Sequence, residues 1–397
     1  MYHIAVDLII VSAFHCLARI CMKEIKDIVL AADVAASENI RMVLATVVKV
    51  EGSSYRRPGA RMLVTEDGQM TGAISGGCLE GDALKKALLA IHQQKNRLVS
   101  YDTNTEEGSS IGLQLGCNGI VHILFEYVDL QRTDHPIALL QRLLQQREEG
   151  LLITFFSTDR QGEQKGTRLL IKDLKEQAFA LDAHYSPLNE HIQFAKRERK
   201  SVLTSFQEKG KNNEVLIEYL VPTVHLVIAG AGNDAKPVVE IAHVLGWETT
   251  VIDGRASHVN ASRFPKATKL LVSPAHEIAT SLSIHPWTVF VLMTHNYAYD
   301  LTLLKDLMHT STPYIGSLGP KIKLLRMFDD MQEAGMTITE SQRSIIYGPV
   351  GLDIGAETSE EIAIAIVAEI KAVLNNRPAT SLKFLKTKIH TEYPTII

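Results

Sequence analysis

Long apolar runs, close cysteine pairs and basic blocks are all missing from this sequence. No stretch reaches 18 consecutive apolar residues, so we predict no membrane span. The four cysteines, Cys16, Cys21, Cys78 and Cys117, form no CxxC pair, which is typical of individual thiols in a reducing compartment rather than of a disulfide framework. The formal net charge of −4 and the lack of a Lys/Arg-rich block argue against a nucleic-acid partner. We therefore expect a cytoplasmic protein.

The length of 397 residues fits about two or three domains, and 46% apolar with 22% charged residues is close to the globular average. Residues 1–21 are fairly apolar, but charged side chains interrupt them and no basic segment precedes the apolar part, so we do not expect a signal peptide. From Met22 the sequence has the pattern of an ordinary amphipathic helix. We expect residues 1–21 to be an extension upstream of a natural start at Met22.

Residues 22–128 are predicted to form a mixed α/β N-terminal domain whose glycines gather in three loops. Helices are expected near residues 22–37 and 79–96, and strands in RMVLATVVKVEG, ARMLVT and GIVHILFEYV. We interpret residues 129–222 as a connecting region with two helical segments and a strand pair, LLITFFST and TRLLIK. Within it, the polar segment KGKNNE is expected to be a turn.

From residue 223 to residue 397 strands alternate with helices, which predicts a Rossmann-like, doubly wound parallel sheet. Gly230, Gly232 and Ala235 follow a strand and open a helix, as in a dinucleotide fingerprint. Asp253 ends the next strand, where a ribose-binding carboxylate is expected, and Arg255 follows it. These residues are candidates for cofactor binding.

Two further residues of this region bear on its ligand. Asp234 places a carboxylate at the mouth of the glycine turn, where repulsion would weaken the binding of a pyrophosphate. The same turn could then hold another phosphorylated or pterin-type ligand. His295 comes just after a strand, where side chains line the ligand crevice of such folds. It is a candidate catalytic acid or base, or alternatively a helix-capping residue together with Thr294 and Asn296.

The segment from residue 51 to residue 82 holds seven glycines and three arginines. Its first part offers guanidinium, hydroxyl and free N–H groups that suit a phosphate or another oxyanion, although a solvated turn is equally consistent with the pattern. The candidate binding residues there are Ser53, Ser54, Arg56, Arg57 and Gly59.

The second part of this segment presents a thiol. Cys78 follows Gly76 and Gly77 at the start of a predicted helix, and a helix N-terminus favours the thiolate that binds soft metals or carries sulfur. A buried, inert cysteine is the alternative. Glu80, in the first helical turn, is expected either to cap N–H groups or to meet the ligand. Cys117 is a second thiol between glycines at the entrance of a strand, and together Cys78 and Cys117 are candidate metal ligands.

The motifs of this chain resemble those of the XdhC/CoxI family, the accessory and maturation factors of xanthine dehydrogenase and other molybdenum hydroxylases. The segments that carry the resemblance, in order, are ATVVKVEGSSYRRPGARMLV, ISGGCLEGD, LGCNGIVHILFE, VIAGAGNDAKPVVEIAHVLGW, VIDGR, VLMTHNYAYD, YIGSLGPKIK and GPVGLDIGAETSEEIAIAIVAEI. Members of this family are often named xanthine dehydrogenase, but this chain lacks the cysteine-rich runs that iron–sulfur clusters require.

The resemblance implies a chaperone that binds the molybdenum cofactor, a molybdopterin with a dithiolene-held molybdenum, without classical turnover of its own. Such a protein protects the cofactor while its terminal sulfur is installed and passes it to the apo-hydroxylase. By this resemblance Cys78 and Cys117 would approach molybdenum or sulfur, while Arg56 and Arg57 would hold the phosphate. Some members have alanine at the position of Cys78. The implied partners are the apo-hydroxylase and a cysteine desulfurase, and a homodimer is expected.

Two other functions stay open at this point. The fingerprint around Gly230, with His295 as acid or base, would suit an NAD(P)-dependent oxidoreductase. A regulatory module, in which a bound nucleotide reports redox state to a partner dehydrogenase, would use the same fingerprint without turnover. Tight NAD(H) binding with hydride transfer would favour the first, and nucleotide-dependent association with a partner would favour the second.

Overall fold

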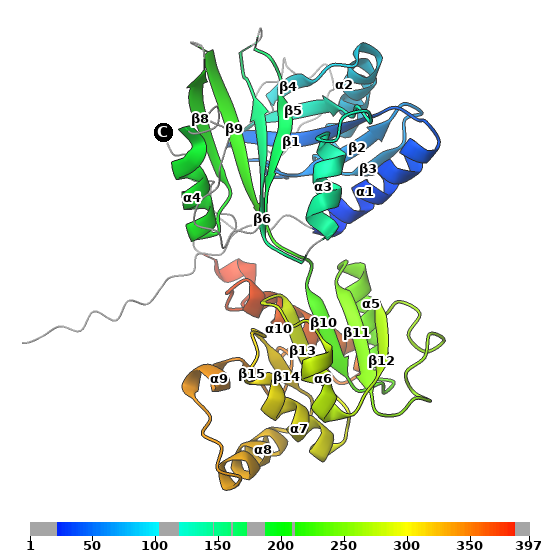
Figure 1. The fold of residues 1–397 in the computed structure, drawn as a ribbon, viewed down its shortest axis with the longest axis vertical. Coiled ribbons are helices and arrows are strands. Elements are labelled where there is room, and N and C mark those ends of the chain that lie inside the picture. The colour runs from blue at the N-terminus through cyan, green and yellow to red at the C-terminus, as the bar shows by residue number, and fades with distance from the viewer. Residues whose placement is uncertain are drawn as a thin grey trace, which may run out of the picture. The chain divides into compact units, whose positions relative to one another are not determined.

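The computed structural model describes residues 22–102, 119–145, 147–159, 162–172, 187–208 and 211–385, excluding the side chains of residues 206–208, 211 and 212. The chain divides between residues 223 and 224 into two compact units. We call the described residues 22–223 the N-terminal unit and the described residues 224–385 the C-terminal unit (Figure 1). Cys117 and the expected extension 1–21 lie outside the described residues.

The first sheet of the N-terminal unit has five strands in the order β3-β2-β1-β5-β4, and all neighbouring strands are antiparallel. Its strands are β1 (Met42–Gly52), β2 (Arg61–Thr65), β3 (Met70–Gly72), β4 (Arg97–Asp102) and β5 (Gly119–Tyr127). The second sheet has four antiparallel strands in the order β7-β6-β9-β8. Its strands are β6 (Gly150–Phe156), β7 (Gly166–Ile171), β8 (Val202–Glu208) and β9 (Lys211–Leu220).

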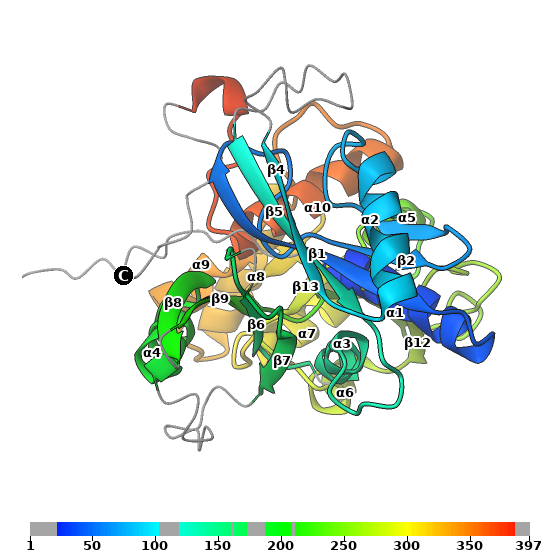
Figure 2. The ribbon, with the colours of Figure 1, turned by 90° about the horizontal axis from the view of Figure 1, so that it is seen from above.

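Four helices accompany these sheets, and their apolar stripes explain where they pack. They are α1 (Met22–Ser37), α2 (Glu80–Gln93), α3 (Pro136–Gln145) and α4 (Asn189–Glu198). In α1 the buried residues Ile25, Ile28, Val29 and Ala32 recur at the three- and four-residue spacing of one helix face. Helix α2 packs its alanine-rich face on β1, β2 and β5 (Figure 2). The small side chains let the helix lie close to the sheet.

The two sheets of the N-terminal unit share apolar and polar contacts. Val48 and Leu124 of the first sheet pack against Phe156 and Leu216 of the second. Helices α1 and α3 form another cluster with residues from both sheets. Strand β1 is buried along most of its length because α2 covers one of its faces and this packing covers the other. The connecting region therefore packs directly on the first sheet.

The C-terminal unit is built on a six-stranded parallel sheet in the order β12-β11-β10-β13-β14-β15. The strands are β10 (His225–Ala229), β11 (Glu248–Asp253), β12 (Lys269–Val272), β13 (Thr288–Leu292), β14 (Ile315–Ser317) and β15 (Ile346–Tyr347). Numbered within the unit, this order is 3-2-1-4-5-6. All strands are parallel, but the order in which successive strands join the sheet reverses between β10 and β13, as in a Rossmann fold. The predicted fold class is confirmed.

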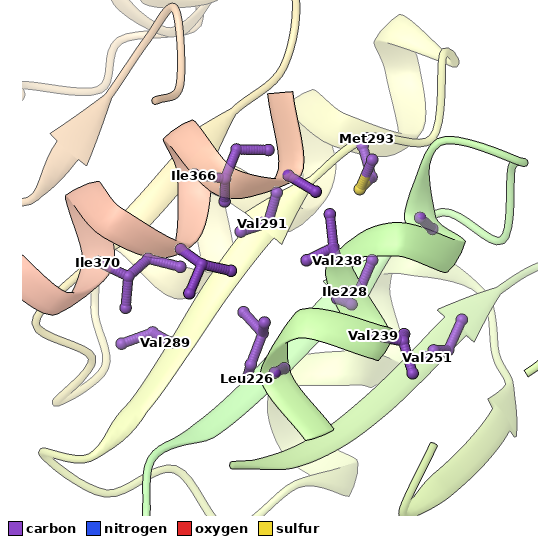
Figure 3. Packing of buried hydrophobic residues seen from close by; sticks show 14 of the residues in the cluster. Leu226, Ile228, Val238, Val239, Val251, Val289, Val291, Met293, Ile366 and Ile370 are labelled. Carbon is purple, nitrogen blue, oxygen red and sulfur yellow. The ribbon is translucent and has the colours of Figure 1, made fainter. Parts of the chain in front are cut away.

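Helices cover both faces of this sheet. They are α5 (Ala235–Val244), α6 (Ala275–Ser281), α7 (Tyr297–Leu307), α8 (Lys321–Glu333), α9 (Glu340–Ser344) and α10 (Ser359–Leu374), followed by a 3₁₀ turn at Leu382–Phe384. Figure 3 shows Val238 of α5 and Ile366 of α10 meeting Ile228 and Val291 of the central strands. Residues of α6, α7 and α8 form the core on the opposite face. Within the described residues, no helix is both long and apolar enough to cross a membrane.

Candidate functional site

The glycine loops of the N-terminal unit come together at one edge of its five-stranded sheet. Because neighbouring strands are antiparallel, β1 and β3 end, and β2 and β5 begin, toward the same end of the sheet. Strands β1 and β5 extend beyond the start of β2, since Arg61 pairs with Thr46. Gly52, at the end of β1, pairs with Gly119, at the start of β5. A Cβ added to Gly119 would lie 2.5 Å from both Glu51 O and Ser53 O, so only glycine allows this approach. We call this end of the strands the loop edge. It consists of residues 53–60, the arginine loop, residues 73–79, the thiol loop, and Glu80 at the start of α2.

The two loops of the loop edge touch through Tyr55 and Gly76. A Cβ added to Gly76 would lie 3.2–3.4 Å from three atoms of the Tyr55 ring, so the ring lies directly on the glycine. The Tyr55 side chain is nevertheless 72% exposed. The sequence alone could not show that the arginine loop and the thiol loop converge. In the structure this aromatic ring joins them.

The thiol loop turns three backbone N–H groups toward one oxygen atom. Ser75 Oγ accepts hydrogen bonds from the N–H groups of Gly77, Cys78 and Leu79, each at 3.1 Å. Leu79 is the N-cap of α2 and has no side-chain capping bond. Three convergent N–H groups resemble the anion-binding concavities called nests, although a neutral hydroxyl oxygen accepts them here. The Cys78 side chain is half-buried beside them.

Glu80 fixes Ser75 in this position. Its carboxylate accepts the Ser75 N–H at 2.8 Å and also the Ser75 hydroxyl proton. Burial opposes ionisation of Glu80, but the hydrogen bonds from Ser75 outweigh it and lower the pKa of the carboxyl group. Of the two roles expected for Glu80, the structure shows the one that satisfies local backbone and hydroxyl donors.

The arginine loop is tied to the rest of the unit by its charges. Arg56 forms an ion pair with Glu24 of α1, and the other carboxylate oxygen of Glu24 accepts the Arg61 N–H at 3.1 Å. Arg57 is half-buried, and Gly59 is buried with a φ of +92° that favours glycine. Arg56 is therefore engaged by a carboxylate, a contact that the sequence did not indicate for either the oxyanion cradle or the solvated turn.

Arg61 has a different role from the other two arginines. It is 1% exposed and forms a bidentate ion pair with the fully buried Glu218 of β9, and it also donates to Gly59 O at 2.8 Å. The Arg61 guanidinium therefore joins the first sheet to the second and fixes the end of the arginine loop. Sequence reasoning missed this pair because its partners are 157 positions apart.

A second group of titratable residues lies beside the loop edge. Lys49 Nζ contacts Glu51 at 3.0 Å and Glu214 at 2.8 Å. His122 lies 3.3 Å from Glu51 through Nε2 and 2.8 Å from the Ser100 hydroxyl through Nδ1. Burial lowers the pKa of His122, and the nearby Glu51 only partly offsets this. This group has no motif in the sequence, because its members alternate with apolar residues on ordinary strands.

In the C-terminal unit the glycine turn follows β10 at the topological switch point. Gly230 has a φ of +122°, and a Cβ there would collide with the carbonyl oxygen of Met293. Asp253, at the end of β11, accepts the Ala231 N–H at 2.9 Å and three donors of Arg255 at 2.8–2.9 Å. Burial opposes ionisation of Asp253, but these hydrogen bonds lower its pKa to about 2. Asp253 and Arg255 thus form an ion pair at the turn.

His295 and Asp234 meet across this switch point. His295 Nε2 lies 2.8 Å from Asp234 Oδ2, and His295 has a φ of +56°, which is uncommon for a residue with a side chain. The other oxygen of Asp234 lies 2.3 Å from the position that a Cβ on Gly232 would take. The N-cap of α7 is Asn296, whose side chain accepts the Tyr299 N–H at 3.1 Å, so His295 is not the capping residue. The Asp234 carboxylate thus lies beside the second glycine of the turn, the position at which the backbone approaches the pyrophosphate in dinucleotide-binding folds.

Two family models match the chain: the XdhC and CoxI family over residues 35–102, and the XdhC Rossmann domain over residues 226–370. A crystal structure from Bacillus halodurans, described as a xanthine dehydrogenase, is 30% identical with a TM-score of 0.70, and the match covers 90% of this chain and 98% of that one. The chain belongs to the XdhC and CoxI family. The family resemblance predicted from the sequence motifs is confirmed.

Two curated relatives of this chain have names that refer to xanthine dehydrogenase or to the molybdenum cofactor. One, from Bacillus subtilis, is named as a probable subunit of xanthine dehydrogenase; it is 29% identical over 346 residues, which cover 85% of this chain and 94% of the relative. The "Molybdenum cofactor insertion chaperone PaoD" of Escherichia coli is 23% identical over 332 residues, which cover 83% of each protein. Each match spans both units of the present chain.

The structure places the predicted residues of this XdhC/CoxI-family chain in two groups. The loop edge collects most of the first-domain candidates: Ser53, Ser54, Arg56, Arg57, Gly59, Gly76, Gly77, Cys78 and Glu80. The switch point of the C-terminal sheet collects Gly230, Gly232, Asp253, Arg255 and His295. Among the described residues no three His, Cys, Asp or Glu side chains form a metal-ligand group, and the pairing of Cys78 with Cys117 stays a prediction.

A polar cavity lies at the other end of the strands of the five-stranded sheet, near the start of β4 and the end of β5. It has a volume of about 740 Å³ and is lined by residues that include Asn96, Glu126, Arg132, His135 and Arg168. Glu126 is 2% exposed and accepts the Thr167 N–H and hydroxyl at 2.5 and 2.9 Å. Burial raises the pKa of Glu126. No sequence motif indicated this cavity, and it is separate from the loop edge.

Proposed function

We propose that this chain is a molybdenum cofactor-binding maturation factor, which protects the cofactor during sulfuration and delivers it to a xanthine dehydrogenase-type molybdenum hydroxylase. The observation that carries the proposal is the loop edge. There, a half-buried thiol, three convergent N–H groups and an arginine loop meet at one end of a rigid sheet. The relative named as a molybdenum cofactor insertion chaperone supports this function.

The donor groups of the loop edge suit the chemistry of the cofactor. A phosphate oxygen can accept the N–H groups of Gly77, Cys78 and Leu79 in place of Ser75 Oγ, because an ionised acceptor forms the stronger hydrogen bonds. The Arg56 guanidinium can exchange Glu24 for the same phosphate. Cys78 places a sulfur ligand next to these groups. When bound, the cofactor supplies molybdenum chemistry that serves the client hydroxylase and not this chain.

The proposed partners are an apo-hydroxylase that receives the cofactor and a cysteine desulfurase that provides sulfur. The relatives named for xanthine dehydrogenase and for cofactor insertion support the first of these. The cytoplasmic location and the homodimer stay predictions from the sequence. The purified chain should raise the activity of an apo-hydroxylase only after it has been loaded with cofactor.

Cofactor uptake tests the placement of the site. The purified chain is incubated anaerobically with molybdopterin cofactor released from a molybdoenzyme and then desalted. Bound pterin is measured by its fluorescence after oxidation, and molybdenum by mass spectrometry. We expect Arg56→Ala to bind the cofactor roughly 10- to 150-fold more weakly, since a hydrogen bond to a charged group contributes about 1.5–3 kcal/mol. Cys78→Ser is expected to lower the ratio of molybdenum to pterin.

Arg41 is the matched control for Arg56. It also forms an ion pair with a glutamate, Glu66, but it precedes β1 and therefore lies at the sheet edge opposite the loop edge. Arg41→Ala should bind cofactor like the wild type. Equal losses from Arg41→Ala and Arg56→Ala, or no loss from either, would place the phosphate away from the loop edge.

An NAD(P)-dependent oxidoreductase is the second candidate, and the Rossmann strand order with Asp253 after β11 favours it. The Asp234 carboxylate opposes it, because this carboxylate lies over Gly232 where the pyrophosphate would approach. We expect calorimetry to detect weak or no NAD(H) binding by the wild type and tighter binding by Asp234→Ala. Tight binding by the wild type, together with hydride transfer, would favour the oxidoreductase.

A further inference from the structure

Tyr55 is the most exposed large apolar or aromatic side chain among the described residues, at 72%. Exposing an aromatic ring to water is unfavourable, because its burial would remove a large apolar area from solvent. The ring is not at a random surface position. It lies at the point where the arginine loop meets the thiol loop. The phosphate and sulfur contacts proposed above do not use it.

Gly76 holds the ring from one side. A Cβ at residue 76 would lie 3.2 Å from Cδ1, 3.3 Å from Cγ and 3.4 Å from Cε1 of Tyr55, so contact with three ring atoms requires glycine or a displaced ring. The ring therefore rests on the main chain of the thiol loop, and most of its remaining surface faces solvent. A ring supported by backbone in this way is positioned before any ligand arrives, which lowers the entropic cost of stacking.

The groups next to the ring suit a planar, polar, anionic ligand. Cys78 and the N–H groups that converge on Ser75 Oγ belong to the same loop as Gly76, residues 73–79. Arg56 directly follows Tyr55 in the arginine loop. An aromatic platform beside anion-binding donors is a common arrangement for ligands that combine a heteroaromatic ring with a phosphate.

We propose that the Tyr55 ring stacks on the pterin ring of the cofactor and so positions it at the loop edge. This inference rests on the proposed cofactor-binding function and adds the residue that recognises the pterin. A stacked pterin would lie at the junction of the two loops, whose N–H groups and Cys78 would hold the phosphate and the sulfur atoms of the cofactor. Stacking needs the ring and not its hydroxyl group.

Four variants test the stack. Tyr55→Phe keeps the ring and should bind cofactor within about twofold of the wild type, whereas Tyr55→Ala should bind about tenfold more weakly, as aromatic platforms for nucleobases do after truncation. Gly76→Ala keeps Tyr55 but displaces its ring by a few tenths of an ångström, and an intermediate loss is expected. Gly81→Ala is the control, because a Cβ at residue 81 meets nothing within 4 Å.

The readouts separate this inference from the function on which it rests. Dissociation constants are measured with cofactor released from a molybdoenzyme, and quenching of the fluorescence of free 6-carboxypterin reports the ring alone. Quenching by the wild type and Tyr55→Phe, but not by Tyr55→Ala, supports the stack. Thermal unfolding of each variant confirms that the loops stay folded.

Three results would overturn the inference. If Tyr55→Ala bound cofactor as tightly as the wild type, the pterin would lie elsewhere although the proposed function would stand. If the only effect of Tyr55→Ala were weaker association with the apo-hydroxylase, the exposed ring would be a contact for a protein partner. If the wild type bound no cofactor, both the stack and the proposed function would fail.

Discussion

The buried ion pair between Arg61 and Glu218 makes a quantitative prediction about the N-terminal unit. Both side chains are almost completely removed from water, and the guanidinium and the carboxylate form two parallel hydrogen bonds. Glu218→Gln keeps the shape of the side chain but removes its charge, so that the Arg61 charge remains buried without compensation. Breaking a buried pair in this way typically lowers the free energy of unfolding by about 3–5 kcal/mol. With a denaturant dependence of about 2 kcal/mol per molar urea, the midpoint should fall by about 1.5–2.5 M.

The positions of the tryptophans allow this loss to be assigned to one unit. Trp247 and Trp287 are the two tryptophans of the chain, and both belong to the C-terminal unit. Urea unfolding of Glu218→Gln, followed by circular dichroism, should therefore show an early transition that tryptophan fluorescence does not detect. The double variant Arg61→Met/Glu218→Leu should recover much of the loss, because apolar side chains can replace a buried pair.

The exposed pair of Arg41 with Glu66 is the control for the buried pair. It also joins an arginine to a glutamate with two hydrogen bonds, but about two fifths of each side chain is exposed, so Glu66→Gln should change the midpoint little. If Glu218→Gln unfolded at the same urea concentration as the wild type, the buried pair would not hold the two sheets together. An equal shift of the tryptophan signal would show that the two units unfold together.

Three further predictions concern single residues. Burial raises the pKa of Glu126, so the folded N-terminal unit keeps a proton that the unfolded chain releases. The stability of this unit should therefore fall as the pH rises above about 4.5. Glu126→Gln should remove this dependence when urea unfolding is compared at pH 4.5 and 7.5. The pKa of Asp253 is lowered to about 2, so its contribution to the stability of the C-terminal unit is present above about pH 4 and lost as the pH falls toward 2. In Asp253→Asn, the stability measured by tryptophan fluorescence should fall less steeply as the pH is lowered from 4 to 2. Gly230→Ala forces a side chain toward the Met293 carbonyl at a φ of +122° and should lower the midpoint of the fluorescence transition. Gly335→Ala, at a φ of +80° and in open space, should lower it less.

Most of the fold follows from patterns within short segments. The parallel sheet and its helices were predictable because apolar strands, glycine turns and amphipathic helices alternate along residues 223–374. The β4 strand was missed because its residues are only half-buried at a sheet edge and lack a continuous apolar run. The expected turn KGKNNE was too long: Lys211–Glu214 belong to β9, where pairing with β8 overrides the low strand propensity of asparagine.

The candidate site was predictable in composition but not in its contacts. Arg56 and Cys78 stand out because they lie in a segment rich in glycine, and such a segment usually marks unusual backbone angles or a close approach of the main chain. Their partners do not stand out, because Glu24 is an ordinary acid in the first turn of a helix and Glu218 one polar residue in an apolar strand. The contact of Tyr55 with Gly76 likewise depends on two loops that only the sheet register brings together. Interactions between distant segments were therefore the part that the sequence could not supply.

The hydroxyl of Ser75 has a consequence for how long a ligand would stay. Because Gly77, Cys78 and Leu79 already donate to Ser75 Oγ, an incoming anion must displace an internal acceptor and gains only the difference between the two sets of hydrogen bonds. When the anion leaves, the serine oxygen takes the donors back, and no backbone group is stranded without a partner. The internal acceptor therefore lowers the affinity of the loop for an anion and shortens the time that the anion stays bound. That is a useful property for a protein proposed to hand its cargo to another enzyme.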